Sequence, residues 1–363
     1  MKTFLKKTVF VVTVLLAISA FVSCNSFASK NKKETAIIAE PVIPLLEEIK
    51  EIVYQKPVVF IAGFDKGTET FYLKARDYFE EKGLKIIEGQ YSLEEIIVWL
   101  NEHGNLQPFS EIHIVNKSNP YKGMCLETVV RGDKITPETL RRTITQGTLP
   151  KLKNVVNNNS KIIFHASGLV ENKALLKTLK DAFHAKESPK VVASPYHTIF
   201  GGEFSNHYLA KPHYIFYPTA HSPGKTDLSK EIAKKYPEEK DIDWYDALSN
   251  VEERYIGEAY TTQFTIPIKW EFDYYNSDTE MPKFTSTEEV MDWIETKDEL
   301  LLELEKYTIS VDKFRWNWSV KGDLLVIRGR TSGLCVLKPL IKPYGDLQHV
   351  EPDTSNKRLY AIK

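Results

Sequence analysis

Three side chains with catalytic potential follow two apolar segments of the chain. Lys117 stands two residues after the segment 111–115, and His165 and Ser167 close the segment 161–167. A serine hydroxyl becomes a nucleophile at neutral pH only when a base lies within about 3 Å of it. Lysine and histidine are both such bases, so Ser167 with Lys117 or His165 would supply the minimal machinery of a hydrolase.

The same residues also have structural interpretations. Alternate residues of a strand share a face but lie about 7 Å apart at their Cα atoms, so His165 reaches Ser167 only with difficulty. Lys117 can be a surface lysine, and Ser167 can cap the helix that follows it. The sequence leaves open whether the protein is an enzyme.

A histidine-rich stretch contains residue types that bind zinc, namely His197, Glu203, His207, His213 and His221. Their spacing matches no compact ligand pattern, such as two histidines one helical turn apart. We therefore expect separate structural partners for these histidines and no metal.

The segment 223–226, Pro-Gly-Lys-Thr, imitates a phosphate-binding loop between an expected strand at 214–217 and an expected helix at 228–235. The motif requires a glycine where Thr219 stands, and Pro223 removes an amide that would cradle phosphate. We expect neither a bound nucleotide nor a cofactor.

Three tryptophans could line a binding face for a glycan or a peptide, because flat rings stack on sugars and anchor interfaces. Trp270, Trp316 and Trp318 all occupy the apolar side of alternating segments, which favours a core position beneath a helix expected at 286–307. The opposite positions, Lys269, Glu271, Arg315 and Asn317, are typical of a solvated face.

Alternating strands and helices must position the first group of residues. Strands are expected at 58–63, 84–87, 112–115, 161–164 and 191–193, and helices at 71–82, 93–102, 137–146 and 172–183. This alternation predicts an α/β domain over 56–205, with a mostly parallel sheet flanked by helices. A site in such a sheet lies beyond the carboxyl ends of its strands, where Lys117 and Ser167 stand.

The rest of the chain predicts a smaller α+β domain over 206–363. Residues 264–272 alternate between apolar and polar side chains, and Pro267 places this strand at a sheet edge. A capping box at Ser286 opens the helix to about Tyr307. Strands expected at 314–320, 324–328 and 334–340, with turns at 321–323 and 331–333, predict an antiparallel meander.

The order and spacing of these strands and strand ends resemble the caspase-like, Rossmann-type fold of clan CD cysteine peptidases over residues 56–200. The resemblance implies a histidine closing the third strand and a cysteine closing the fourth. This sequence has Lys117 at the first position, or Asn116 in a shifted register, and Ser167 at the second. The resemblance therefore implies the fold without the thiol chemistry of that family.

The amino end has the layout of an export signal. Lys2, Lys6 and Lys7 precede an apolar run over 8–22, which is too short to span a bilayer. The run ends in Ser23-Cys24, which resembles the lipobox of bacterial lipoproteins, although Phe21 replaces the usual aliphatic residue. The resemblance implies a signal peptide over 1–23 and a lipid on Cys24. The small residue after Cys24, which is not aspartate, favours sorting to the outer rather than the inner membrane.

Residues 24–55 then form a polar tether and a short amphipathic helix at 41–54. Without residues 1–23 the chain has a charge of about −4, from 45 basic and 49 acidic residues. This balance argues against nucleic acid as a partner. Cys125 and Cys335 could pair in an oxidising compartment, although the apolar neighbours of Cys335 favour a buried thiol.

The sequence thus predicts a lipid-anchored protein of the bacterial cell envelope. Because the positions expected to carry catalysis hold the wrong residues, we expect a non-catalytic protein that binds a protein, peptide or glycan. The alternatives are a hydrolase acting through Ser167 with Lys117 or His165 as the base, and a purely structural component of the envelope.

Overall fold

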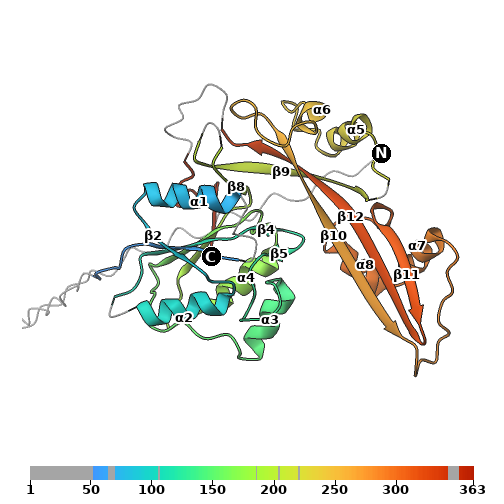
Figure 1. Ribbon diagram of the computed structural model, residues 1–363, viewed down its shortest axis with the longest axis horizontal. Helices are drawn as coiled ribbons and strands as arrows, with labels where there is room; N and C mark the ends of the chain where they lie inside the picture. The colour runs from blue at the N-terminus through green and yellow to red at the C-terminus, as the bar shows by residue number, and fades with distance from the viewer. Residues whose placement is uncertain are drawn as a thin grey trace, which may run out of the picture. The chain divides into compact units, whose positions relative to one another are not determined.

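A parallel sheet forms the first half of the fold (Figure 1). Its strands are β1 (Val58–Ile61), β2 (Lys85–Glu88), β3 (Glu111–Val115), β6 (Lys161–His165) and β7 (Lys190–Ala193). They pair in the order β2-β1-β3-β6-β7, and the short strand β13 (Ala361–Ile362) joins antiparallel to β7. The computed structural model describes residues 52–63, 70–104, 107–184, 186–202, 205–219, 221–341 and 351–363.

Helices cover both faces of this sheet. Helix α1 (Thr70–Glu81) lies on one face, and α2 (Leu93–His103), α3 (Pro137–Thr145) and α4 (Lys173–Ala182) lie on the other (Figure 1). Capping boxes at Ser92 and Thr136 begin α2 and α3. Strands β1, β3, β6 and β7 are buried on both faces, which explains their runs of apolar residues, whereas the edge strand β2 is only partly buried. The prediction of a mostly parallel sheet flanked by helices is confirmed.

An antiparallel sheet forms the second half. Its strands are β8 (His197–Phe200), β9 (His207–Pro218), β10 (Tyr260–Asp273), β11 (Arg315–Lys321) and β12 (Leu324–Pro339). The order is β10-β12-β9-β8, with β11 paired to β12 as well. Strand β10 pairs with β12 alone among the described strands, so Pro267 lies on an edge strand as predicted.

The turn predicted at 331–333 is wrong, because β12 runs through these residues without interruption. Its first half pairs with β11 and its second half with β9, and the partner changes between Arg330 and Thr331. The Thr331 hydroxyl donates to the Tyr217 carbonyl at 3.1 Å. Polar residues that are typical of a turn therefore mark an exchange of partner strands here.

Helices also cover parts of both faces of the antiparallel sheet. Helices α7 (Thr287–Glu295) and α8 (Asp298–Glu305) and the 3-10 helix η1 (Val311–Lys313) pack on one face. Helices α5 (Lys225–Lys235) and α6 (Trp244–Ala247) pack on the other. The single helix predicted at 286–307 is instead two helices, which break at Thr296 and Lys297.

The two halves share chain segments. Residues 51–363 group into one compact unit, the strand β13 returns to the parallel sheet, and Phe200 of β8 packs with the core on the α1 side. The boundary expected at 205/206 lies between β8 and β9, which pair with each other. The expected signal peptide, Cys24 and most of the expected tether lie outside the described residues, as does the greater part of the helix expected at 41–54. No helix in the described ranges is long and apolar enough to cross a membrane.

Candidate functional site

The carboxyl ends of β3 and β6 lie side by side, as the sequence predicts for the residues that follow them. The Asn116 amide donates to the His165 carbonyl at 3.3 Å, and the Ser118 hydroxyl donates to the Ser167 carbonyl at 2.7 Å. The short hairpin of β4 (Ser118–Asn119) and β5 (Gly123–Met124) follows. The Lys117 amide donates to the Tyr72 hydroxyl at 2.8 Å. The hydrogen bonds at this edge therefore mainly hold neighbouring chain segments together.

The Ser167 hydroxyl forms no hydrogen bond with any residue that the structure describes. The N-cap of the following helix α4 is Asn172, whose side chain accepts a hydrogen bond from the Leu175 amide, so Ser167 is not the helix cap. His165 is 3% exposed, and its Nε2 is hydrogen-bonded to Nδ1 of His113 at 3.0 Å. The ring of His165 thus lies in the core on the α1 face and is engaged there.

A chain of titratable side chains leads from this histidine pair to the partly exposed Glu111 and Lys161. His113 Nε2 lies 3.6 Å from a Glu111 carboxylate oxygen, and the Lys161 ammonium donates to the other at 2.9 Å. The hydrogen bond from His113, followed by Lys161, lowers the pKa of Glu111 to about 2.

Burial determines the ionisation of His165, His197 and His207. It lowers the pKa of His165 well below its usual value, that of His207 to about 3 and that of His197 to about 4. His207 contacts the Tyr78 hydroxyl at 3.3 Å, and His197 the Tyr214 hydroxyl at 2.9 Å. These histidines are neutral parts of the packed interior at pH 7.

The histidine-rich stretch has separate partners, as the sequence predicts. His213 Nε2 lies 3.2 Å from Glu239, away from the partners of His197 and His207, and Glu203 lies outside the described residues. Among the residues that the structure covers, no group of three or more His, Cys, Asp or Glu side chains could hold a metal ion.

The two cysteines of the described chain do not pair. Cys125 is half-buried, and Cys335 is fully buried between apolar neighbours, as its sequence context predicts. Burial raises the pKa of the Cys335 thiol. Cys335 is therefore a small core side chain with no nucleophilic character at neutral pH.

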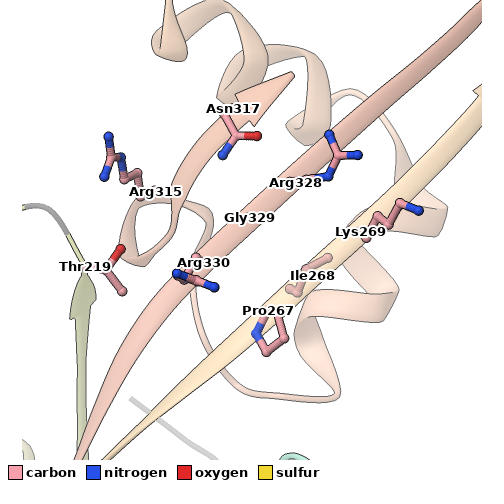
Figure 2. A pocket seen from close by; sticks show the side chains of 9 residues that line it. All are labelled: Thr219, Pro267, Ile268, Lys269, Arg315, Asn317, Arg328, Gly329 and Arg330. Carbon is pink, nitrogen blue, oxygen red and sulfur yellow. The ribbon is translucent and has the colours of Figure 1, made fainter. Parts of the chain in front are cut away.

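A hollow of about 360 Å³ lies on the outer face of β10, β12 and β11 (Figure 2). We call it the cationic groove, because its lining includes one lysine and three arginines. These are Lys269, Arg315, Arg328 and Arg330. Helices α5 and α6 cover the same face farther along β12, where Leu334 and Val336 contact them, and the groove lies where this cover ends.

Strand register fixes the arrangement of these cations. In one row Lys269, Arg328 and Asn317 are direct cross-strand neighbours, and in the next row Arg330 pairs with Arg315. Strands lie about 4.8 Å apart and alternate residues about 7 Å apart, so the groove presents a compact field of positive charge. Figure 2 shows the Arg330 side chain on β12, with Arg315 of β11 to one side of it and Lys269 of β10 to the other.

The cations of the groove differ in their partners. Lys269 forms an ion pair with Glu271 at 2.5 Å, and Arg328 donates to the Ser319 hydroxyl at 3.2 Å. Arg315 and Arg330 form no hydrogen bond or ion pair with any part of the chain that the structure describes. Like charges directly opposite each other on paired strands destabilise a sheet. The fold therefore retains an uncompensated pair of charges at this position.

Aromatic rings form the floor beneath the groove. Trp270 and Trp316 stack with centroids 5.3 Å apart, and their indole nitrogens donate to Glu303 and to the Val311 carbonyl. A Cβ on Gly329 would lie 2.4 Å from the Trp316 ring, so only glycine fits there. The core position predicted for these two tryptophans is confirmed, and it gives the cations a rigid base.

Trp318 differs from this pair. It is only half-buried and lines a second hollow of about 280 Å³ with Met281, Phe284 and Val320. Its ring contacts Phe284 edge-on at 5.8 Å. The prediction of a core position is therefore correct for two of the three tryptophans.

Sequence reasoning assigned Lys269, Arg315 and Asn317 to a solvated face and did not single out Arg328 and Arg330. The residues are exposed, but they belong to one hollow because β12 lies between the other two strands. The sequence did contain one usable signal, because Arg328 and Arg330 are two residues apart and therefore lie on the same face of a strand.

Comparison of the chain with protein-family models, with curated sequences and with solved structures finds no match.

Proposed function

We propose that this chain is a lipid-anchored protein of the bacterial cell envelope that binds a protein, peptide or glycan partner without catalysis. The amino-terminal signal and Ser23-Cys24 support the anchor. Asn25 after the cysteine supports the outer membrane as its location. The partner binds through an acidic surface, because the groove that receives it is cationic.

The uncompensated pair Arg315 and Arg330 carries this proposal. Two guanidinium groups on directly paired positions repel each other, and no described side chain forms a hydrogen bond or ion pair with either of them. An acidic partner that binds both would remove that cost. Arginine suits this role, because its weakly hydrated planar fork binds carboxylates and phosphates in bidentate geometry.

The carboxyl edge of the parallel sheet supports the absence of catalysis. His165 is bonded to His113 in the core, and the Ser167 hydroxyl has no base within hydrogen-bonding distance among the described residues. A caspase-like arrangement remains part of the proposal, and the strand order β2-β1-β3-β6-β7 supports it. In that arrangement the thiol and imidazole positions hold Ser167 and Lys117.

Co-purification from membranes tests the binding role. The full chain, solubilised in neutral detergent, should recover the same envelope component repeatedly, and Arg315→Gln/Arg330→Gln should reduce that recovery at least tenfold. Lys151→Gln/Lys153→Gln removes two exposed charges far along the sequence from the groove and is the matched control. Equal recovery by all three proteins would contradict the proposal.

Membrane fractionation tests the anchor separately. Cys24→Ala should move the protein from the membrane fraction to the soluble fraction, because the substitution removes the thiol that would carry the lipid. A Cys24→Ala variant that stays in the membrane fraction would refute the lipid anchor. The binding role of the groove is tested separately by co-purification.

The alternative is a hydrolase acting through Ser167, with Lys117 or His165 as the base. The hydrogen bond from the Ser118 hydroxyl to the Ser167 carbonyl favours the hydrolase, because it holds the ends of β3 and β6, which carry the candidate residues, together. Labelling by a fluorophosphonate probe that is lost in Ser167→Ala, but not in Ser118→Ala, would establish the hydrolase over the binding protein.

A further inference from the structure

The cationic groove has features that distinguish among acidic ligands. It contains four cations and one adjoining carboxylate, Glu271, which is already bound to Lys269. The remaining three charges are all guanidinium groups, on Arg315, Arg328 and Arg330. Guanidinium groups donate hydrogen bonds in a fixed planar fork, so the ligand must offer several acceptor oxygens in a small space.

We propose, on the basis of the binding function above, that the cationic groove is a site for a phosphomonoester group. A carboxylate has one negative charge and two coplanar oxygens, which a single arginine fork occupies. A phosphomonoester has a charge of about −1.5 to −2 at pH 7 and three terminal oxygens. Only the second matches two guanidinium groups that begin at directly paired positions.

The neighbours of the arginine pair fit the same ligand. Arg328 and Lys269 lie one row away along the strands, close enough to contact a substituent of the ester. Asn317 and Thr219 add uncharged hydrogen-bonding groups to the lining. Each of these side chains except Thr219 is exposed, so the group can enter from solvent without displacing core residues.

A long polyanion fits the groove less well. The described lining has no aromatic side chain on which a base could stack, because Trp270 and Trp316 face the opposite side of the sheet. The chain as a whole has no excess of positive charge to follow a phosphodiester backbone. The groove is therefore suited to one isolated phosphate group.

Calorimetric titration of the full chain in dodecyl maltoside at low salt tests the proposal. Glucose 6-phosphate is one probe, with glucose and glucuronate as ligands that lack a phosphate or replace it with a carboxylate. We expect glucose 6-phosphate to bind at least tenfold more tightly than glucuronate, which is about 1.4 kcal/mol. Mixed micelles with phosphatidic acid, compared with phosphatidylglycerol, test a lipid-borne phosphomonoester.

Variants link the binding to the groove. Arg315→Gln/Arg330→Gln should weaken binding of the phosphorylated probe at least tenfold, and Lys151→Gln/Lys153→Gln should change it less than twofold. Circular dichroism verifies that both variants are folded. Binding in the soluble arm, the micelle arm or both supports the proposal and identifies the source of the phosphate.

Three results would overturn it: no binding in either arm, equal binding of glucuronate, or equal binding by the arginine variant. If co-purification still depends on Arg315 and Arg330, such a result removes only the phosphate assignment. If co-purification is also independent of these residues, the proposed function fails with it.

Discussion

The carboxyl edge of the parallel sheet and the outer face of the antiparallel sheet use their polar residues in opposite ways. At the edge, Ser118 bonds to Ser167 across the strand ends, and His165 is buried against His113. On the outer face, Arg315 and Arg330 are exposed and have no partner among the described residues. If the groove is the binding site, polar groups without partners are a better guide to function in this fold than the customary position of a site.

If each region has the role that this contrast assigns to it, changes in the core beneath the groove and in the core beside the edge should cost the most stability. Loss of the edge serine hydroxyl should cost almost nothing.

The floor of the groove should be the most sensitive position. Trp316→Ala removes a ring that is 3% exposed and stacked on Trp270, so we expect a loss of about 3–5 kcal/mol in the free energy of unfolding. Urea denaturation measures it. Trp318→Ala, at a half-buried ring of the same strand, is the matched control and should cost clearly less. Equal losses would mean that the floor is not specially packed.

Acid should destabilise the core beside the edge. Burial holds the folded pKa of His207 at about 3 and that of His197 at about 4, below the value of about 6.5 in the unfolded chain. The unfolded chain therefore binds more protons, and stability falls as the pH decreases from 6.5. We expect a loss of at least about 2 kcal/mol between pH 6.5 and 4.5 by urea denaturation.

Variants assign that acid response to the buried rings. His165→Gln keeps a hydrogen-bonding group beside His113 but cannot titrate, so its stability should fall less steeply over this pH range. His184→Gln, at an exposed ring, should keep the slope of the native protein. The contribution of Glu111 to stability is separate, because its pKa is lowered from the ordinary value of 4.5 to about 2. The stability that this carboxylate adds is therefore lost between about pH 4.5 and pH 2. A flat profile for the native chain would refute the neutral histidine core.

The glycine beneath the groove should tolerate no side chain. A Cβ at Gly329 would lie 2.4 Å from Trp316, so Gly329→Ala should cost about 1–3 kcal/mol and weaken ligand binding by displacing β12. Thermal and urea unfolding measure the first effect. Gly224→Ala, where a Cβ meets nothing within 4 Å, loses only the preference for glycine at the N-cap of α5 and should cost less, about 0.5 kcal/mol. If Gly329→Ala is equally mild, the tryptophan does not constrain the groove.

The edge serine should be dispensable. Ser167→Ala removes a hydroxyl with no described partner, while the Ser167 carbonyl that accepts from Ser118 remains. We expect less than about 0.5 kcal/mol of destabilisation and unchanged recovery of the partner. A marked loss of partner recovery would indicate that the functional site lies at the edge of the parallel sheet and not in the groove, and would favour the hydrolase.

The parallel half could be predicted well because its signals are local. Continuous apolar runs mark strands buried on both faces, and the capping box at Ser92 marks a helix start. The single helix expected at 286–307 was wrong because its apolar periodicity continues across the break at Thr296 and Lys297. Periodicity reports which face is buried and does not report continuity of the backbone.

The groove could not be predicted because it depends on register between distant segments. Arg315 and Arg330 become neighbours only when β11 pairs with β12, and the misplaced turn at 331–333 cut β12 in two. The pairing of His113 with His165 was missed for the same reason, since 52 residues separate them. The sequence shows which residues of one strand share a face, but it does not show which residues of another strand lie beside them.

Site-specific cross-linking in cells compares the two regions most directly. The full chain would incorporate p-benzoylphenylalanine either at Asn317, in the groove, or at Ser167, at the edge of the parallel sheet. We predict a discrete adduct from position 317 that disappears in the Arg315→Gln/Arg330→Gln background, and none from position 167. An adduct from position 167 alone, or one from 317 that survives loss of both arginines, would contradict the assignment of binding to the cationic groove.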